Sequence, residues 1–178
     1  MKIGILGGGR VGGALAQTWR EAGHNVTIST RETIAATAAG ADVLVLAVPS
    51  TAAQEVLAAA GPLADKVVID ATNNLSGGPD GQAIAGFAPD ARMVKAFNTV
   101  FSQFFHDTRP ARPASLVYCG DDGDAKAVAA TLIEDLGFEP VDAGGSEQTA
   151  AVESFAKLVI GIAYQQGRGP FVYRFESA

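Results

Sequence analysis

The feature that most constrains the fold is a glycine pattern close to the N-terminus. The chain reads Gly7-Gly8-Gly9-Arg10-Val11-Gly12, with glycines at the three positions of a G-x-G-x-x-G pattern. The pattern follows the apolar run Lys2–Leu6 and precedes a segment with helical spacing of apolar residues. In that context Gly7 permits a tight turn, Gly9 lets a pyrophosphate approach the backbone, and Gly12 lets helix and strand pack closely. We favour a bound dinucleotide over a glycine-rich turn that serves packing alone.

Short apolar runs alternate with helical stretches along the rest of the chain. The run Val43–Val48 is apolar at every position, as is typical of a strand buried on both faces of a parallel sheet. The alternation predicts an α/β fold, Rossmann-like and doubly wound, with a mostly parallel sheet and a short C-terminal helical extension. The expected strands are Lys2–Leu6, Asn25–Ser29, Asp42–Val48, Lys66–Asp70, Arg92–Ala96, Ser115–Cys119 and Phe138–Asp142.

The connections between these strands carry their own signals. The segment between Arg31 and Asp42 has room for one short helix, Thr33–Ala38, so we expect the third strand to return beside the first. The second strand is then left near the sheet edge. A later helix is expected to begin at an Asp124 cap and to end at Gly137, and the longest helix to begin near Ser146.

The nucleotide preference is read at the end of the second strand. A carboxylate there typically selects NAD, but this chain has Ser29, Thr30 and Arg31. Hydroxyls and a guanidinium suit a 2′-phosphate, which predicts NADP(H). The carboxylate of Glu32 would partly offset the charge of Arg31. The alternative is that Arg31 is a solvated surface residue.

Polar residues also follow the third, fourth and fifth strands, where open α/β sheets bind ligands. Pro49-Ser50-Thr51 ends the third strand, Thr72-Asn73-Asn74 follows the fourth, and Lys95–Thr99 closes the fifth. A lysine in a central strand is costly to bury unless it is paired or faces a ligand. For Pro49 and the two asparagines, turn formation alone remains an alternative.

No catalytic acid, base, nucleophile or metal cluster is evident. We interpret His24 as a surface turn residue, favour a structural role for His106 over a place in a pocket, and expect Cys119 to be buried. The net charge of −6 without a basic cluster argues against nucleic acid. Because no long apolar run or leader pattern is present, we expect no membrane association and a cytoplasmic location, which a single cysteine fits.

A family resemblance becomes specific at the fifth strand. The segment Val94-Lys95-Ala96-Phe97-Asn98-Thr99-Val100 resembles a signature of the coenzyme F420-dependent NADP oxidoreductase family. The same signature occurs in the cytosolic reductase domain of the STEAP metalloreductases. The loop Ile3–Gly13 and the segments Ala47–Pro49 and Asp70–Asn73 follow in matching order, so the resemblance covers nearly the whole chain.

The resemblance implies hydride transfer between NADPH and F420 or a flavin, FMN or FAD, and a homodimer. The residues that it places at the dinucleotide are Gly7, Gly9, Arg10, Val11 and Gly12 in the loop, and Ser29, Thr30 and Arg31 at the 2′-phosphate. Those that it places on the nicotinamide side are Val48, Pro49, Asn73, Ala96 and Asn98. Transfer between two stacked rings needs no positioned acid or base, so the lack of a catalytic side chain agrees with it.

The expected organisation is one domain. Residues 1–145 form the NADP(H)-binding Rossmann-like part, and residues 146–178 a helix and tail that contact a second subunit or the substrate pocket. A chain of 178 residues has little room for a separate substrate domain. The aromatic tail Gly169–Phe175 could instead pack on its own domain. Two other functions remain open: a flavin-mediated ferric reductase, and a non-catalytic NADP(H)-binding redox sensor.

Overall fold

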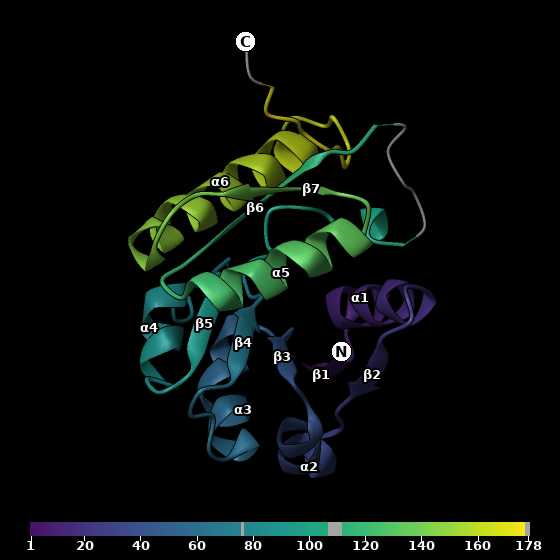
Figure 1. The fold of residues 1–178 in the computed structure, drawn as a ribbon. Coiled ribbons are helices and arrows are strands. Elements are labelled where there is room, and N and C mark those ends of the chain that lie inside the picture. The colour runs from purple at the N-terminus through teal and green to yellow at the C-terminus, as the bar shows by residue number, and fades with distance from the viewer. Residues whose placement is uncertain (76, 107–111, 177–178) are drawn as a thin grey trace.

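The computed structural model describes residues 1–75, 77–106 and 112–176, which form a layered α/β structure around one sheet (Figure 1). The strand order is β2-β1-β3-β4-β5-β6-β7. The first five strands are parallel, β6 runs antiparallel to β5, and β7 runs parallel to β6. The strands are β1 (Lys2–Leu6), β2 (Asn25–Ile28), β3 (Val43–Leu46), β4 (Val67–Asp70), β5 (Arg92–Lys95), β6 (Ser115–Gly120) and β7 (Glu139–Asp142). The predicted fold class is confirmed.

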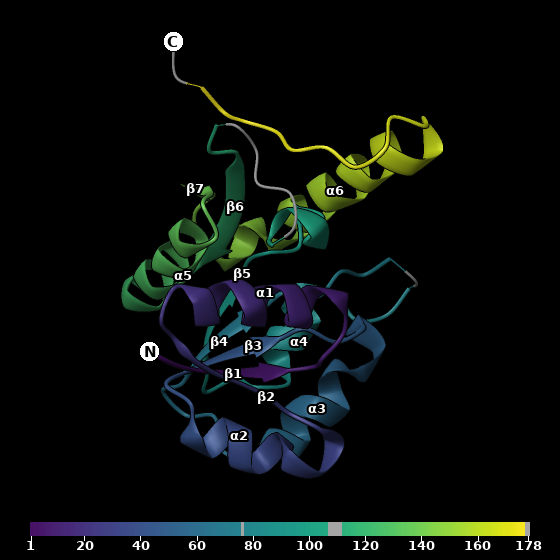
Figure 2. The same cartoon turned by 90° about the vertical axis from the view of Figure 1, so that its right-hand side faces the viewer.

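Helices cover both faces of the sheet. Figure 2 shows α1 on one side of the strands and α2 and α3 on the other. The helices are α1 (Arg10–Glu21), α2 (Ile34–Gly40), α3 (Ala53–Ala60), α4 (Gly81–Gly86), α5 (Gly123–Asp135) and α6 (Thr149–Ile160), which a π-helical turn, Gly161–Gln165, extends. On the first face the Trp19 indole N–H donates to the Leu132 carbonyl at 2.9 Å, joining α1 to α5.

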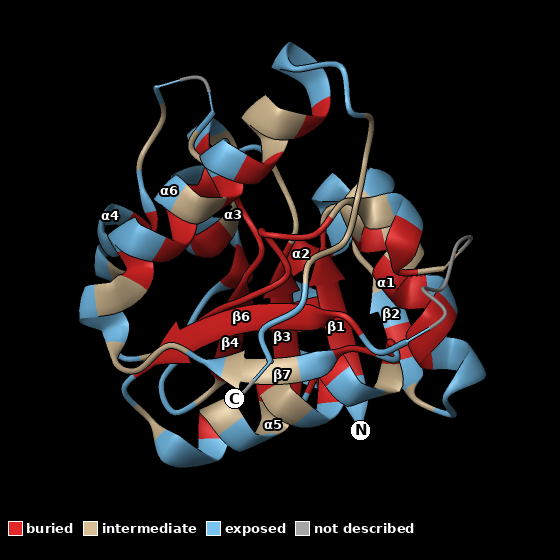
Figure 3. Cartoon of the chain, turned by 90° about the horizontal axis from the view of Figure 1, so that it is seen from above, coloured by how far each residue is buried: buried red, intermediate tan, exposed pale blue. Residues whose placement is uncertain are grey.

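The core follows the alternation of side chains along the strands. Val43 and Val45 of β3 belong to the cluster beneath α1 and α5, whereas Leu44 and Leu46 belong to the cluster beneath α2 and α3. All four are nearly inaccessible to solvent, and Figure 3 shows the central strands as buried along their length. The continuous apolar run is thus explained by a sheet covered on both faces.

The order of the strands confirms that the chain crosses back after β2. Because the connection contains only a short 3₁₀ turn, Arg31–Thr33, and α2, strand β3 pairs with β1 and leaves β2 at the edge. The edge is not bare. The Arg20 guanidinium donates through Nε and Nη2 to the Val26 carbonyl, at 3.3 and 2.9 Å, on the side of β2 that faces away from β1.

One predicted cap is wrong. The N-cap of α5 is Asp122, whose carboxylate accepts from the Ala125 amide at 2.8 Å, and Asp124 lies in the first turn. Asp122 is favoured because it also binds Arg92 of β5. The end of the same helix agrees with prediction, since Gly137 has a positive φ of 81° just beyond the last turn.

The aromatic tail packs on its own domain. The Ser115 amide at the start of β6 donates to the Tyr173 carbonyl at 2.9 Å, and the Phe175 amide donates to the Ser115 hydroxyl at 2.9 Å. The ring of Tyr173 lies edge-on to Phe155 of α6, with centroids 4.8 Å apart. In the described part of the chain, no helix combines the length and apolarity that crossing a membrane requires.

Candidate functional site

In the glycine loop between β1 and α1, close packing requires glycine at two positions of the pattern, Gly7 and Gly12, but not at Gly9. A Cβ on Gly7 would lie 2.4 Å from the Ala47 carbonyl oxygen, and Gly7 has a φ of +117°. A Cβ on Gly12 would lie 2.0 Å from the Gly7 oxygen. Around Gly9, at the N-cap of α1, no atom lies within 4 Å of such a Cβ. Packing explains the first two glycines, whereas the open space at Gly9 is what close approach of a pyrophosphate to the backbone needs.

A cavity of about 540 Å³ opens on one side of this loop, and we call it the Arg31 cavity. It brings together predicted residues from the carboxyl ends of three neighbouring strands. Its lining includes Gly7, Gly8, Ser29, Thr30, Arg31, Ile34, Val48 and Pro49. The ends of parallel strands meet at one edge of a sheet, which is why segments separated in the sequence converge here.

The electrostatics at the end of β2 are mixed. The Thr30 hydroxyl donates to a Glu32 carboxylate oxygen at 2.7 Å, and this bond is the main cause that lowers the pKa of Glu32. The Thr30 amide is also occupied, because it donates to the Thr33 hydroxyl at 2.8 Å. Arg31 is exposed and lines the cavity. The guanidinium of Arg31 and the hydroxyl of Ser29 therefore remain as donors for an anion.

A second cavity, of about 290 Å³, lies on the other side of the loop, and we call it the Asn98 cavity. It contains four predicted residues: Arg10, Val11, Asn73 and Asn98. Of the remaining lining, Thr99 belongs to the predicted strand-end segment Lys95–Thr99, and the other residues were not predicted from the sequence as part of a site. The remaining lining consists of Leu75, Thr99, Val100, Phe101, Ser102, Ala156, Val159, Ile160 and Tyr164. Helix α6 and its π-helical extension thus provide a wall of this cavity.

Phe97, which directly precedes the lining residues Asn98 and Thr99, has an unusual backbone conformation. Phe97 has a φ of +66°, which is rare for a residue with a side chain. Its buried ring is held edge-on between Trp19 and Phe105, with centroid distances of 5.5 and 6.1 Å. This packing offsets the backbone strain and turns the following residues, Asn98 and Thr99, toward the cavity wall.

Two asparagines hold each other at the ends of β4 and β5. The Asn73 side-chain amide donates to the Asn98 backbone carbonyl at 2.9 Å, and the Asn98 side-chain amide donates to Asn73 Oδ1 at 3.2 Å. Asn98 is only 4% exposed, and its Oδ1 has no hydrogen-bond partner in the described structure. A buried acceptor without a donor is unfavourable by about 1–3 kcal/mol, so it points to a missing partner.

The central-strand lysine is paired. Lys95 Nζ lies 2.9 Å from a carboxylate oxygen of Asp70 and 2.9 Å from one of Glu153, and it donates to the Thr72 carbonyl at 2.7 Å. All three charged side chains are almost fully buried. The cluster connects β4 and β5 to α6, and it satisfies the lysine without a ligand. The sequence placed Glu153 on an expected helix, but no pattern identified it as part of a buried charged cluster.

The comparisons with known proteins bear on this arrangement. Residues 2–39 and 33–74 match the model of a family described as NADP oxidoreductase, coenzyme F420-dependent. A structure from Arthrobacter sp. FB24, assigned as an F420-dependent NADP-reductase, superposes with a TM-score of 0.88. It is 28% identical, and the match covers 99% of this chain and 100% of that one. The resemblance to the F420-dependent NADP oxidoreductase family is confirmed.

More distant structures share the fold. A hypothetical protein from Sinorhizobium meliloti is 25% identical with a TM-score of 0.67, over 82% of this chain and 85% of that one. A reductive aminase from Aspergillus terreus, in complex with NADPH4, cyclohexanone and allyl amine, is 20% identical with a TM-score of 0.73. That match covers 94% of this chain but 62% of the aminase. These matches show the shared Rossmann-like fold.

Some of the residues considered in the sequence analysis line neither cavity. Ala96 is fully buried in the core and lines neither of them. His24 binds Asp135 at 2.8 Å, and Cys119 is buried beside Thr149, where burial raises the pKa of its thiol. His106 contacts the Thr18 hydroxyl at 3.5 Å. None of these three side chains lines either cavity.

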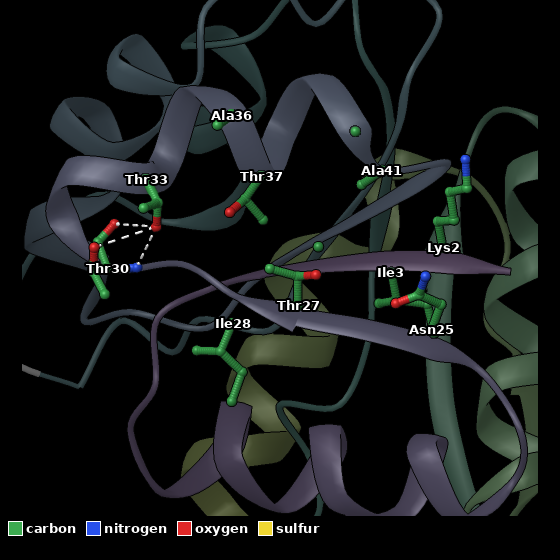
Figure 4. Close-up of a pocket in the computed structure, with 12 residues that line it drawn as sticks. Lys2, Ile3, Asn25, Thr27, Ile28, Thr30, Thr33, Ala36, Thr37 and Ala41 are labelled. Atoms are coloured by element: carbon green, nitrogen blue, oxygen red, sulfur yellow. Dashed lines mark hydrogen bonds between the residues drawn. The ribbon is translucent and has the colours of Figure 1, made fainter.

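A groove of about 470 Å³ lies between α2 and the β1–β2 edge, next to the Arg31 cavity. Figure 4 shows Thr27 and Thr37 facing it from strand and helix, with Lys2 and Asn25 toward one end. Thr30 is the predicted site residue that it shares with the Arg31 cavity. The groove follows from the short connection, since α2 covers this part of the sheet incompletely.

Proposed function

We propose that this chain, by family an NADP-dependent oxidoreductase, transfers hydride between NADP(H) and coenzyme F420 or a flavin such as FMN or FAD. NADPH, when bound, supplies a hydride, and a proton from water completes the two-electron reduction of the acceptor. The observation that carries the proposal is the pair of cavities on opposite sides of the glycine loop. One has the donors for a phosphorylated ribose, and the other has walls for a flat ring.

The residues of the Arg31 cavity would hold the adenosine and phosphate part of NADP(H). The open space at Gly9 admits the pyrophosphate to the N-terminus of α1, where free amides and the helix dipole favour an anion. Arg31 and Ser29 would bind the 2′-phosphate. Val48 and Pro49 line the path between that end and the loop.

The Asn98 cavity would hold the reacting rings. Among its described lining residues there is no Asp, Glu, His, Lys or Cys. The rings of Phe101 and Tyr164 stand edge-on at 5.6 Å on one side, and Val11 and Val159 add apolar surface. Ring-to-ring hydride transfer depends on proximity and orientation rather than on a positioned acid or base, and this lining is compatible with it.

The test is a panel of acceptors with the intact protein. NADPH oxidation is followed optically with F420, FMN, FAD and a ferric chelate, the last with and without added flavin. Turnover with F420 or a free flavin supports the proposal. Iron reduction that requires flavin favours the ferric reductase, and tight NADPH binding without any turnover favours the sensor. Asn98→Leu serves as the site variant and Thr131→Val, on the exposed face of α5, as its matched control.

The proposal includes a homodimer. Leu158 of α6 and Tyr164 beyond it are 58% and 63% exposed, on the same helix that lines the Asn98 cavity. Large apolar side chains exposed together favour coverage by a second copy. Sedimentation equilibrium of wild type and Leu158→Glu tests this, and a monomer in both would contradict it.

A further inference from the structure

The tail and the end of β5 form a contact that the proposed function does not yet use. The Tyr173 hydroxyl donates to the Thr99 hydroxyl oxygen at 2.6 Å. Thr99 is 2% exposed and lines the Asn98 cavity. The hydrogen bonds of the described residues include no acceptor for the proton of Thr99 itself. Thr99 is therefore a donor whose own proton is unused.

The neighbouring residue, Asn98, has an acceptor that lacks a donor. Asn98 Oδ1 is a buried acceptor without a donor, and Asn98 lines the same cavity. Its orientation is fixed, because the Asn73 side-chain nitrogen is engaged with the Asn98 carbonyl, so Asn73 Oδ1 must receive the Asn98 nitrogen. An inverted Asn98 amide would set two oxygens against each other. Two adjacent residues of the cavity lining thus carry one free donor and one free acceptor.

The donor is fixed from the tail. Tyr173 is held by its backbone bond to Ser115 and by ring contact with Phe155. The Tyr173 phenol is the donor in its bond to Thr99, and burial raises the pKa of that phenol to about 12. Since Thr99 accepts that proton, its own proton must point elsewhere.

We propose that Asn98 and Thr99 together recognise an amide edge, a C=O beside an N–H, on a planar ring in the Asn98 cavity, with Tyr173 as a positioning residue that orients the Thr99 hydroxyl. The Asn98 oxygen accepts from the N–H, and the Thr99 hydroxyl donates to the C=O. This inference rests on the proposed function, because it concerns the ring bound at that site. It deepens that function by selecting ligands with an amide edge over simple ketones and imines, which lack it.

Two redox rings contain such an edge. A flavin or deazaflavin has it in its pyrimidinedione ring, and the nicotinamide of NADP(H) has it in its carboxamide. The chemistry recognised is the same, so the experiment has one arm for each source. In the first arm FMN is compared with N3-methyl FMN, which lacks the N–H. In the second arm NADPH is compared with its reduced 3-acetylpyridine analogue, which lacks the amide nitrogen.

The readout is the dissociation constant of each ligand, measured by fluorescence, so turnover is not required. The variants are Thr99→Val, which removes the hydroxyl at nearly constant shape, and Tyr173→Phe, which removes only its orienting partner. The matched control is Tyr118→Phe, on β6, because Tyr118 is a tyrosine of the core that lines neither cavity. Thermal unfolding of each variant accompanies the binding data.

In one of the two arms, we expect the analogue to bind wild type about tenfold more weakly than its parent. In that arm Thr99→Val and Tyr173→Phe weaken the parent by about tenfold and fivefold, and the analogue by similar factors, because the analogue keeps the C=O to which Thr99 donates. Tyr118→Phe leaves both constants unchanged. If Tyr173 acts by orienting the Thr99 hydroxyl, Tyr173→Phe causes no further loss of affinity in a Thr99→Val background. Additive losses in the double variant would show a merely structural role of Tyr173, and that result overturns the inference.

The inference is also overturned if neither analogue binds wild type more weakly than its parent. Should Tyr173→Phe fail to fold, the Thr99→Val ratios decide by themselves. The absence of turnover with every acceptor in the panel counts against the proposed function, whereas these binding ratios test ring recognition alone. The two failures are therefore distinguishable.

Discussion

The two cavities beside the glycine loop are built in different ways. The residues that line the Arg31 cavity lie between Gly7 and Ala59, at the ends of three adjacent parallel strands and in the helical segments that follow two of them. The Asn98 cavity draws its lining from Arg10 to Tyr164, and it depends on contacts between distant segments. The first is a product of local turns and strand order, and the second of long-range hydrogen bonds and ion pairs. Variants that break only one kind of contact should therefore disturb one cavity more than the other.

The largest effect is expected where the long-range cluster is broken. Lys95→Met leaves Asp70 and Glu153 as buried carboxylates without a counter-charge, which lowers the free energy of unfolding by about 3–5 kcal/mol. Lys126→Met is the control, because the Lys126–Asp142 pair is more exposed to solvent and its loss changes stability little. Urea unfolding of both variants checks this. Equal losses would show that α6 is not held by the buried cluster.

The next effect concerns the loop itself. Gly12→Ala forces a Cβ against the Gly7 backbone oxygen, and we expect a loss of about 2–3 kcal/mol in the free energy of unfolding. Gly13→Ala is the matched control, since nothing lies within 4 Å of its Cβ and alanine favours the helix by about 1 kcal/mol. The two neighbouring substitutions should shift the urea midpoint in opposite directions. A shift in the same direction would contradict the close packing of loop and helix.

A third variant separates binding from folding in the same loop. Gly9→Ala has free space around the new Cβ, so its unfolding should match that of wild type within about 0.5 kcal/mol. The methyl group would occupy the approach to the backbone, and we expect the dissociation constant of NADPH to rise roughly tenfold. Isothermal titration alongside urea unfolding measures both quantities. Unchanged NADPH affinity would leave the open space at Gly9 without a ligand to explain it.

Cofactor preference is a smaller and more local effect. Arg31→Ala should weaken NADPH roughly fivefold while changing NADH by less than twofold, because the guanidinium has its target only in the 2′-phosphate. Arg174→Ala, in the tail, removes the same charge elsewhere and serves as the control. Titration with both cofactors at one salt concentration is the measurement. Equal losses for NADPH and NADH would reject the assignment of Arg31.

The smallest expected effect is the pH dependence of the stability that a long-range ion pair, Arg92–Asp122, contributes. The hydrogen bond from Arg92 lowers the pKa of Asp122 from 3.8 to about 2, so its stabilising contribution is present above about pH 4. That contribution is lost as the pH falls toward 2. The melting temperature of wild type should therefore exceed that of Asp122→Asn at pH 5, and the difference should shrink by pH 2.5. A constant difference would mean that the ion pair between β5 and α5 contributes nothing.

The same contrast explains how far the sequence could be interpreted. The strands and the Arg31 cavity were predicted from Gly7–Gly12, the apolar runs and Ser29–Arg31, because strand period and turn chemistry act over short distances. Asp124 was taken for the cap because the Arg92 contact that favours Asp122 comes from another strand. Which of the two aspartates, Asp122 or Asp124, caps α5 therefore depended on tertiary structure.

The Asn98 cavity was predicted only in part. Asn73, Asn98 and Thr99 were identified from their place after strands, but Val159 and Tyr164 were not assigned to a site. The last two depend on the path of α6, and the role of Thr99 depends on the Tyr173 contact; no local pattern indicates either. The family signature included Ala96, whose side chain the sheet places in the core. A motif identifies a segment, and the strand's alternation decides which of its side chains face the ligand.

The bond between Arg20 and the Val26 carbonyl has a consequence for behaviour at high concentration. Strand β2 is an open edge of a seven-stranded sheet, and an exposed row of backbone groups invites pairing with another chain. The guanidinium occupies the outward carbonyl of that edge with two donors. A charged side chain from the preceding helix thus covers part of this edge, which disfavours edge-to-edge pairing with another sheet.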